Sequence, residues 1–289
     1  MFKGSIVALV TPFKNGIIDE EKVKELVELH ISNGTDAIVS CGTTGESPTL
    51  SHDEDVLLTD LVVKAANRRV PVIAGTGSNS TAEALFLTEH AKANGADAAL
   101  IVVPYYNKPT QEGMYQHYKY LAENVDIPII LYNVPGRTVA GLLPETVVRL
   151  SKIPGIVAIK EATGSVDSAM QILHEVPDFT VLSGDDGMTF PMMALGAKGV
   201  ISVAANIIPR QMADLCRLML EGRVAEARVI HYKCMDLFRG LFFEANPIPV
   251  KAAMHMMGMI SDEIRLPLTR MSDGPKDKLK KMLRDAGLI

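Results

Sequence analysis

One lysine of this chain follows a segment that would bury its side chain. Lys160 comes directly after residues 156–159, a continuous apolar run of the kind that forms a buried strand. Burial disfavours the charged ammonium form of a lysine, and a neutral amine can attack a ketone to form an imine. The same position would also suit a lysine that extends to solvent, or one that pairs with Glu161 or Asp185. Position alone leaves a catalytic and a structural interpretation open.

Other polar side chains follow other apolar runs. Thr43 and Thr44 stand between glycines, where backbone amides can approach a small anion, although a tight turn would need the same glycines. Tyr132 follows residues 127–131 and could transfer protons in carbonyl chemistry, unless its hydroxyl is simply hydrogen-bonded at the protein surface. Arg137 lies in a Pro-Gly-Arg segment and could bind a carboxylate through two parallel hydrogen bonds, although a solvated loop charge is the commoner case.

Short apolar runs alternate with longer amphipathic stretches along the chain. The eight runs are residues 6–10, 37–40, 70–74, 98–103, 127–131, 156–159, 180–182 and 199–203. Unbroken apolar runs indicate strands that are covered on both faces. The segments 51–54 and 80–83 read as capping boxes, which begin helices between the runs. Eight strand–helix units predict a closed (β/α)8 TIM barrel. The alternative, an open doubly wound sheet, would normally have fewer strands and a phosphate-binding loop.

The predicted barrel brings the polar residues together. In a TIM barrel the catalytic groups lie at the C-terminal ends of the strands and in the loops that follow them. Lys160, Tyr132, Arg137 and the two threonines all come directly after a predicted strand. We therefore expect their hydroxyl, amine and guanidinium groups to converge on one rim.

Only helical patterns follow the last apolar run. They cover about residues 209–220, 223–244, 249–257 and 276–285. The first of them completes the barrel, so we expect residues 1–222 to form the barrel that carries the active site. Residues 223–289 would form a C-terminal helical region packed on the barrel, since no low-complexity linker separates the two parts.

Composition narrows the class of protein. The net charge is -5 and no basic block is present, which disfavours nucleic acid as a partner. No apolar segment is long enough to span a bilayer, so we expect no membrane association. Cys41, Cys216 and Cys234 are few, distant and odd in number, which is typical of reduced thiols in the cytoplasm. The seven histidines show no metal-ligand spacing, so we expect no metal.

Several motifs together resemble one enzyme family. Gly42-Thr43-Thr44-Gly45-Glu46, Tyr132-Asn133-Val134-Pro135-Gly136-Arg137-Thr138 and Ile159-Lys160-Glu161-Ala162-Thr163-Gly164 closely resemble the dihydrodipicolinate synthases. Asn246-Pro247-Ile248-Pro249-Val250-Lys251 is also similar to that family, and the resemblance covers essentially the whole chain. The wider superfamily includes N-acetylneuraminate lyases and 2-keto-3-deoxy sugar acid aldolases. Arg137, after Tyr-Asn-Val-Pro-Gly, resembles a feature of the synthases.

The resemblance implies a role for each matching residue. Lys160 would form an imine with pyruvate, and Thr43, Tyr132 and Tyr106 would relay protons. The tyrosine that matches Tyr106 reaches into the partner's site across a dimer interface in that family.

Other matches concern the carboxylates of the substrates. Thr44 would bind the carboxylate of pyruvate, and Arg137 would bind that of L-aspartate 4-semialdehyde. Gly184 and Ile201 match backbone contacts near the lysine.

The resemblance also implies the reaction and the assembly. Pyruvate and L-aspartate 4-semialdehyde would condense to 4-hydroxy-tetrahydrodipicolinate, the first committed step of diaminopimelate and lysine biosynthesis. The imine itself would serve as the electron sink, so no cofactor is expected, and the chain would form a homotetramer built as a dimer of dimers. A sister aldolase acting on a sugar acid and a non-catalytic sensor of pyruvate or lysine are the alternatives.

Some family members are inhibited by L-lysine at a dimer-interface site. The positions that match this site are Ser47, His52, Asn79, Glu83 and Tyr105. Two neighbouring positions depart from the lysine-sensitive pattern, because Pro48 replaces alanine and Asp55 replaces histidine. The resemblance therefore implies the site without implying inhibition.

Overall fold

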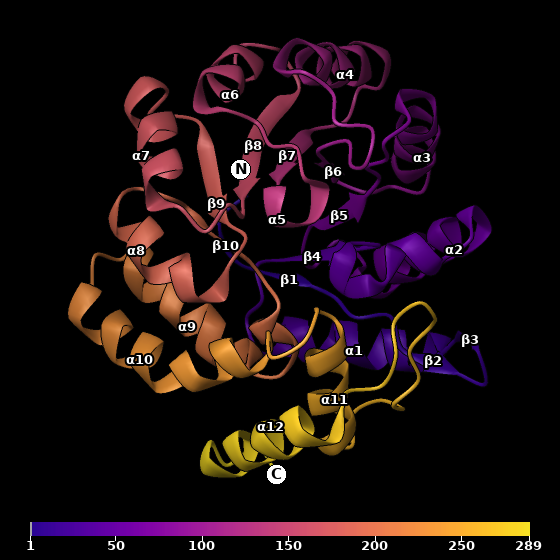
Figure 1. The fold of residues 1–289 in the computed structure, drawn as a ribbon, viewed down its shortest axis with the longest axis vertical. Coiled ribbons are helices and arrows are strands. Elements are labelled where there is room, and N and C mark those ends of the chain that lie inside the picture. Colours follow the sequence, from indigo (N-terminus) through magenta and orange to yellow (C-terminus); the bar gives the residue numbers. More distant parts are fainter. Residues whose placement is uncertain (1) are drawn as a thin grey trace.

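Eight parallel strands form a closed barrel. A computed structural model describes residues 2–289, and its strand order is β1-β10-β9-β8-β7-β6-β5-β4 (Figure 1). The strands are β1 (Gly4–Ala8), β4 (Ala37–Ser40), β5 (Val72–Gly75), β6 (Ala98–Val102), β7 (Ile129–Asn133), β8 (Ile156–Glu161), β9 (Thr180–Ser183) and β10 (Gly199–Ser202). Because β1 pairs with both β4 and β10, the sheet has no edge. The predicted TIM barrel is confirmed, and the open doubly wound sheet is wrong.

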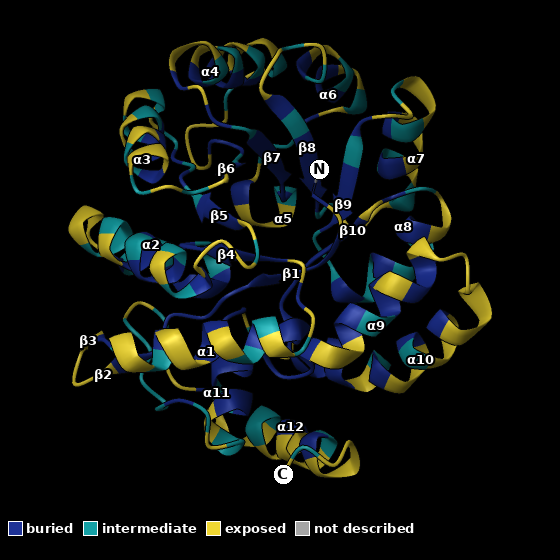
Figure 2. Ribbon diagram, turned by 180° about the vertical axis from the view of Figure 1, so that it is seen from behind, coloured by how far each residue is buried: buried dark blue, intermediate teal, exposed yellow. Residues whose placement is uncertain are grey.

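Helices surround the barrel as an outer ring. They are α1 (Glu20–Ser32), α2 (His52–Ala66), α3 (Thr81–Ala93), α4 (Gln111–Asn124), α6 (Pro144–Leu150), α7 (Val166–Glu175), α8 (Thr189–Ala194) and α9 (Pro209–Leu220). The single turn α5 (Pro135–Thr138) follows β7. Figure 2 shows that the ring helices turn buried faces toward the strands and exposed faces outward.

Two predicted helix starts have different outcomes. The Ser51 hydroxyl and the Glu54 carboxylate form both halves of a capping box at the start of α2. Ser80 also accepts a hydrogen bond from the backbone N–H of Glu83, but the reciprocal half is missing. The Glu83 carboxylate instead accepts hydrogen bonds from Ser78 and contacts His52. The predicted box at residues 80–83 is therefore only half correct.

Aliphatic side chains fill two separate layers of core. The inner layer lies inside the barrel and consists mainly of alternate strand residues, among them Ile6, Val39, Ile73, Leu100, Ile130, Ala158, Leu182 and Ile201. The other residues of each strand point outward and pack against the helices. Because successive strand side chains face opposite ways, a residue's place in the strand decides whether it faces the barrel interior.

The C-terminal helices pack on the outside of the ring, along one side of it. They are α10 (Val224–Gly240), α11 (Ile248–Met256) and α12 (Asp273–Asp285), and α12 contacts both of the others (Figure 1). The helix expected to reach residue 244 ends at Gly240, where a turn begins, and α12 starts at Asp273, three residues before the predicted start. None of the helices in residues 2–289 combines the length and apolarity needed to cross a bilayer.

A short hairpin was not predicted. Strands β2 (Phe13–Lys14) and β3 (Ile17–Ile18) have two residues each, too few to produce a periodic pattern. The backbone N–H groups of Asn15 and Gly16 at its turn donate to the Glu263 carboxylate, at 2.9 and 2.8 Å. The hairpin thereby joins the start of the chain to the C-terminal region.

Candidate active site

Lys160 points into the barrel from the C-terminal end of β8. Ala158, two residues earlier, belongs to the inner core, and the two-residue period of a strand puts Lys160 on the same face. The lysine is 6% exposed.

Neither carboxylate considered as a partner from the sequence pairs with this lysine. Glu161 faces the other side of β8, where it accepts hydrogen bonds from Asn133, Thr163 and Ser168. Asp185 accepts hydrogen bonds from the backbone N–H groups that follow it, at residues 187 and 188. The interpretation of Lys160 as one half of an ion pair is therefore wrong.

Tyr132 is the immediate neighbour of Lys160. The two residues are register partners in the parallel pair of β7 and β8. The lysine Nζ lies 4.1 Å from the centroid of the tyrosine ring, and both side chains are buried. A phenol and an amine thus share one enclosed place, which is what proton transfer to and from a carbonyl adduct requires.

Gly184 and Ile201 also lie near the pair formed by Lys160 and Tyr132. The backbone N–H of Gly184 donates to the Glu161 carbonyl at 2.8 Å. A Cβ at position 184 would be 3.1 Å from the Lys160 Cε, so the absence of a side chain lets the strand pass close to the lysine. Ile201 packs in the inner core together with Tyr132.

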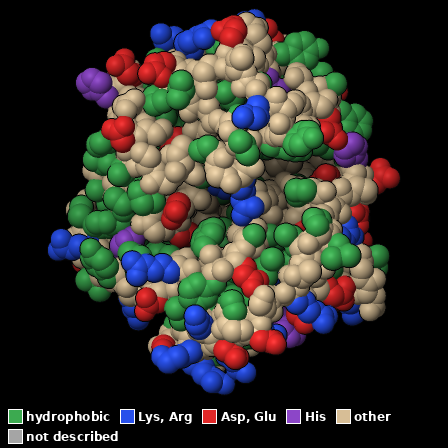
Figure 3. Space-filling view, in the orientation of Figure 1, with side chains coloured by type: hydrophobic (Ala, Val, Ile, Leu, Met, Phe, Trp, Pro, Cys, Tyr) green, Lys and Arg blue, Asp and Glu red, His purple; other side chains and the backbone are tan. Residues whose placement is uncertain are grey.

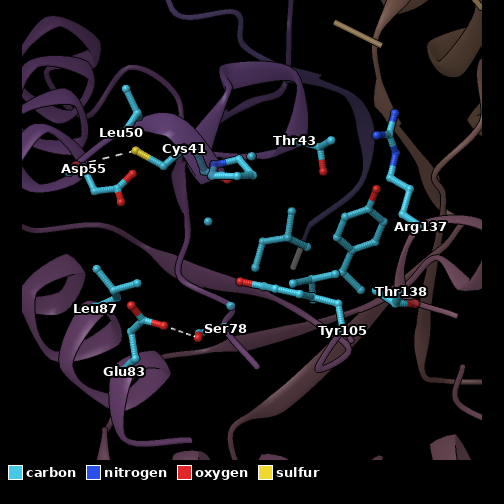
Figure 4. A pocket seen from close by; sticks show the side chains of 18 of the residues that line it. Cys41, Thr43, Leu50, Asp55, Ser78, Glu83, Leu87, Tyr105, Arg137 and Thr138 are labelled. Carbon is cyan, nitrogen blue, oxygen red and sulfur yellow. Dashed lines mark hydrogen bonds between the residues drawn. The ribbon is translucent and has the colours of Figure 1, made fainter. Parts of the chain in front are cut away.

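A cavity of about 370 Å³ opens beside this pair, at the C-terminal ends of β4 to β7. The sequence-predicted residues that line it are Thr43 and Tyr132 from the catalytic set, Arg137 from the substrate-binding set, and Ser47, His52, Glu83 and Tyr105 from the effector set. Figure 3 shows it as a hollow near the centre of one face, with a basic side chain at its edge. In the close-up, Thr43 and Arg137 lie near one end of the pocket and Glu83 and Asp55 near the other (Figure 4). The two predicted sites therefore share one cavity.

Other predicted residues do not line this cavity. Lys160, Thr44, Gly184 and Ile201 are buried or half-buried outside its lining, and Asn79 is absent from it as well. Tyr106 is 88% exposed and has a φ of 73°, in the left-handed region that a tyrosine rarely adopts. Within this single chain Tyr106 does not line the cavity that Thr43 and Tyr132 line.

The mouth of the cavity is the end where Thr43 and Arg137 lie, and Asn246 of the C-terminal region contacts it. Its side-chain Nδ2 donates to the Thr44 Oγ1 at 3.0 Å, and its backbone carbonyl accepts a hydrogen bond from Arg137 at 3.0 Å. Residues 246–251 resemble the family motif, but no local pattern in the sequence predicts a function for Asn246 itself. The contact joins residues 202 positions apart, so only the folded chain reveals it.

Asp55 gives the far wall of the cavity an unusual carboxyl group. Burial raises the pKa of Asp55 to about 7, and its Oδ1 is buried without a hydrogen-bond partner among residues 2–289. The nearby Glu83 differs, because the hydrogen bond from Ser78, and then the one from His52, lowers the pKa of its carboxyl. Cys41 contacts the Asp55 carbonyl through its sulfur at 3.5 Å, and burial raises the pKa of this thiol well above its usual value (Figure 4).

No group of three or more histidine, cysteine or acidic side chains within residues 2–289 is arranged to hold a metal ion. The polar groups at the mouth are instead an amine, hydroxyls, one guanidinium and one carboxamide. They are suited to forming an imine and to binding carboxylates.

Comparison with known proteins assigns the chain to a family. A sequence model of the dihydrodipicolinate synthetase family matches residues 1–286. The 4-hydroxy-tetrahydrodipicolinate synthase of Geotalea daltonii is 58% identical over 290 residues, which cover 100% of both chains. The pyruvate complex of dihydrodipicolinate synthase from Acinetobacter baumannii has a TM-score of 0.98 and 50% identity over 100% of both chains. The lysine-bound enzyme from Cyanidioschyzon merolae has a TM-score of 0.96 and 42% identity, covering 100% of this chain and 99% of that one. This chain belongs to the dihydrodipicolinate synthetase family.

Proposed function

We propose that this chain condenses pyruvate with L-aspartate 4-semialdehyde to give 4-hydroxy-tetrahydrodipicolinate, in the biosynthesis of diaminopimelate and lysine. Membership of the family supports the reaction class. The observation that carries the assignment to particular atoms is the buried Lys160 Nζ, 4.1 Å from the centroid of the Tyr132 ring and beside an open cavity. Lys160 is the covalent nucleophile of this proposal.

The reaction proceeds through an imine. The Lys160 amine adds to the keto carbon of pyruvate, and loss of one water gives the imine, with Tyr132 and Thr43 carrying protons. The protonated imine accepts the electron pair left when a methyl proton departs, so the enamine forms without a further cofactor. The enamine carbon then attacks the aldehyde of L-aspartate 4-semialdehyde. Finally the amine of that substrate displaces Lys160 and closes the ring.

The substrate carboxylates are bound by separate groups. Thr44 binds the carboxylate of pyruvate, and Arg137, at the outer edge of the cavity, binds that of the semialdehyde. The backbone at Gly184 and Ile201 contacts the adduct. Residues 1–222 form the catalytic barrel in this proposal, and residues 223–289 form the helical region packed on it.

The assembly in this proposal is a homotetramer, built as a dimer of dimers. Tyr106 enters the cavity of a partner chain, where it completes the relay of Thr43 and Tyr132. Its exposure and its left-handed backbone, which costs about 1–2 kcal/mol, support a role outside its own chain. The large apolar side chains of Met170, Leu195, Val229 and Tyr232 are also exposed, and their exposure supports a second interface.

L-lysine is the candidate inhibitor of this proposal, bound by Ser47, His52, Asn79, Glu83 and Tyr105. The acidic wall of the cavity supports a cationic ligand, and lysine is bound by the enzyme from Cyanidioschyzon merolae. We place the enzyme in the cytoplasm, where its three free, buried cysteines would stay reduced.

Borohydride trapping tests the proposal. Reduction in the presence of pyruvate should attach one pyruvate unit to the peptide that contains Lys160, and Lys160→Ala should prevent this. Lys198→Ala, at an exposed lysine near the opposite end of the barrel, is the control and should still be trapped. A wild-type protein that forms no adduct would exclude the mechanism and favour a sensor.

A panel of aldehydes then separates the synthase from its sister aldolases. L-aspartate 4-semialdehyde should be the preferred acceptor for the enamine that the unreduced enzyme forms from pyruvate. Faster turnover of a sugar aldehyde would contradict the proposed substrate while leaving the imine chemistry intact.

A further inference from the structure

One residue of the C-terminal region, Asn246, contacts two predicted substrate-binding residues. Asn246 lies between α10 and α11 and is 5% exposed. Its side chain contacts Thr44 and its backbone carbonyl contacts Arg137. These are the two residues to which the proposed function assigns the two substrate carboxylates.

Buried charges hold this part of the C-terminal region in place. Lys251 pairs with Glu46, and both side chains are almost completely buried. The Lys251 Nζ also donates to the Thr11 carbonyl at 3.0 Å, and the backbone N–H of Arg265 donates to the second Glu46 oxygen at 3.0 Å. Glu46 lies two residues after Thr44, so the threonine loop and Asn246 are anchored to the same framework.

The Asn246 contact controls the direction of a hydrogen atom. The carboxamide NH2 can only donate, so the Thr44 Oγ1 is the acceptor in this bond. A threonine hydroxyl carries one hydrogen that it can donate. Within residues 2–289 the Thr44 hydroxyl accepts the bond from Asn246 and donates none. That hydrogen therefore has no acceptor within residues 2–289.

The other end of the carboxamide has no partner. The Asn246 Oδ1 is buried and accepts no hydrogen bond from residues 2–289. A buried acceptor without a donor is unfavourable, so this side chain is not arranged for stability alone. Replacing it by alanine removes one hydrogen bond and one unsatisfied oxygen, and the two effects oppose each other.

We propose that Asn246 is a positioning residue for keto-acid binding, which orients the Thr44 hydroxyl so that its hydrogen points to the substrate carboxylate. The inference rests on the proposed function, because it takes pyruvate as the ligand of Thr44. Asn246 acts through Thr44 and need not touch the reacting atoms.

Steady-state kinetics of Asn246→Ala provide the first test. The KM for pyruvate should rise about tenfold, as expected when one hydrogen bond to a charged group is weakened. The kcat and the KM for L-aspartate 4-semialdehyde should stay within about twofold, because the backbone carbonyl that holds Arg137 is retained. Equal rises in both KM values would indicate a general distortion of the mouth and would overturn the proposal.

Asn246→Asp reverses the hydrogen bond with little change of shape. An aspartate can only accept, so Thr44 must donate its hydrogen to it and cannot donate to the substrate. The KM for pyruvate should therefore rise more than in Asn246→Ala. A rise no larger than that of the alanine variant would contradict the assigned direction.

A double-mutant cycle with Thr44→Val tests whether Asn246 acts through the hydroxyl. In the Thr44→Val background, Asn246→Ala should cause no further change in the KM for pyruvate. Independent, multiplying effects would overturn the proposal. Asn33→Ala is the control for loss of an asparagine side-chain hydrogen bond, since Asn33 ends α1 ahead of β4, away from the C-terminal ends of the strands.

Borohydride trapping distinguishes the proposed role of Asn246 from the proposed function of the whole chain. At saturating pyruvate, borohydride should still label Lys160 in Asn246→Ala. Normal trapping with an unchanged KM for pyruvate would disprove the role of Asn246 alone. Failure of trapping in the wild-type protein would disprove the proposed function itself.

Discussion

Gly184 lies against the side chain of Lys160 across the neighbouring strands β8 and β9. A Cβ at position 184 would be 3.1 Å from the Lys160 Cε and 2.5 Å from the Ala162 Cβ. The second distance is too short for any real contact, so a side chain here would displace Ala162 or the lysine. The position of the Lys160 amine therefore depends on a glycine in the loop that follows β9.

We expect Gly184→Ala to slow imine formation. A displacement of about 1 Å at a reacting group can reduce the rate by about 100-fold. The rate of borohydride trapping with pyruvate measures this step directly. Gly274→Ala is the control, because a Cβ there meets no atom within 4 Å, and its trapping rate should not change. A normal trapping rate in Gly184→Ala would show that the lysine can move without losing its reactivity toward pyruvate.

Arg137→Ala should affect one substrate selectively. Arg137 is exposed at the edge of the cavity and is held by the Asn246 carbonyl, away from the buried amine. Loss of a charge-assisted contact to a carboxylate should raise the KM for L-aspartate 4-semialdehyde at least tenfold. The rate of pyruvate trapping should be nearly unchanged. Unchanged semialdehyde kinetics would remove the role assigned to Arg137.

Lys251→Met should destabilise the protein strongly. The substitution would leave the Glu46 carboxylate buried without its partner, and breaking a buried ion pair in this way typically costs about 3–5 kcal/mol. Urea unfolding measures the change. The double variant Glu46→Gln/Lys251→Met should recover part of the loss, because it removes the uncompensated charge. Lys281→Met, which breaks a solvent-exposed pair with Asp285, should have a much smaller effect.

The buried carboxyl of Asp55 should make stability depend on pH. Its pKa of about 7 in the folded protein exceeds the unfolded value of about 4, so folding favours the protonated form. The stability contributed by this proton is complete below about pH 4 and is lost as the pH rises through 7. Asp55→Asn resembles the protonated form permanently. The Tm of this variant relative to wild type should therefore be higher at pH 8 than at pH 5, and an equal difference at both pH values would contradict the assignment.

Much of the barrel could be predicted from local sequence patterns. Strands β4 and β8 begin at the expected residues, since an unbroken apolar run must be covered on both faces wherever it occurs. The helix α9 matches its predicted bounds because an amphipathic pattern marks its whole length. The hairpin β2–β3 escaped prediction because two residues per strand cannot show a period.

The candidate site was predicted less completely than the fold. The positions of Lys160 and Tyr132 at strand ends followed from the barrel itself, because the C-terminal ends of its strands share one rim. The strand period alone puts Glu161 on the face opposite Lys160, but only the closed barrel decides which of these two faces of β8 it encloses.

Local sequence thus determined the elements, their order and the rim on which the reactive groups stand. Only the tertiary structure decided that Asn246 contacts Thr44, that Lys251 pairs with Glu46, and that residues predicted for catalysis and for effector binding line one cavity. The physical reason is distance along the chain. Hydrophobic period and capping act between neighbouring residues, whereas these polar contacts join segments about 200 positions apart and exist only after the barrel has closed and the C-terminal region has packed against it.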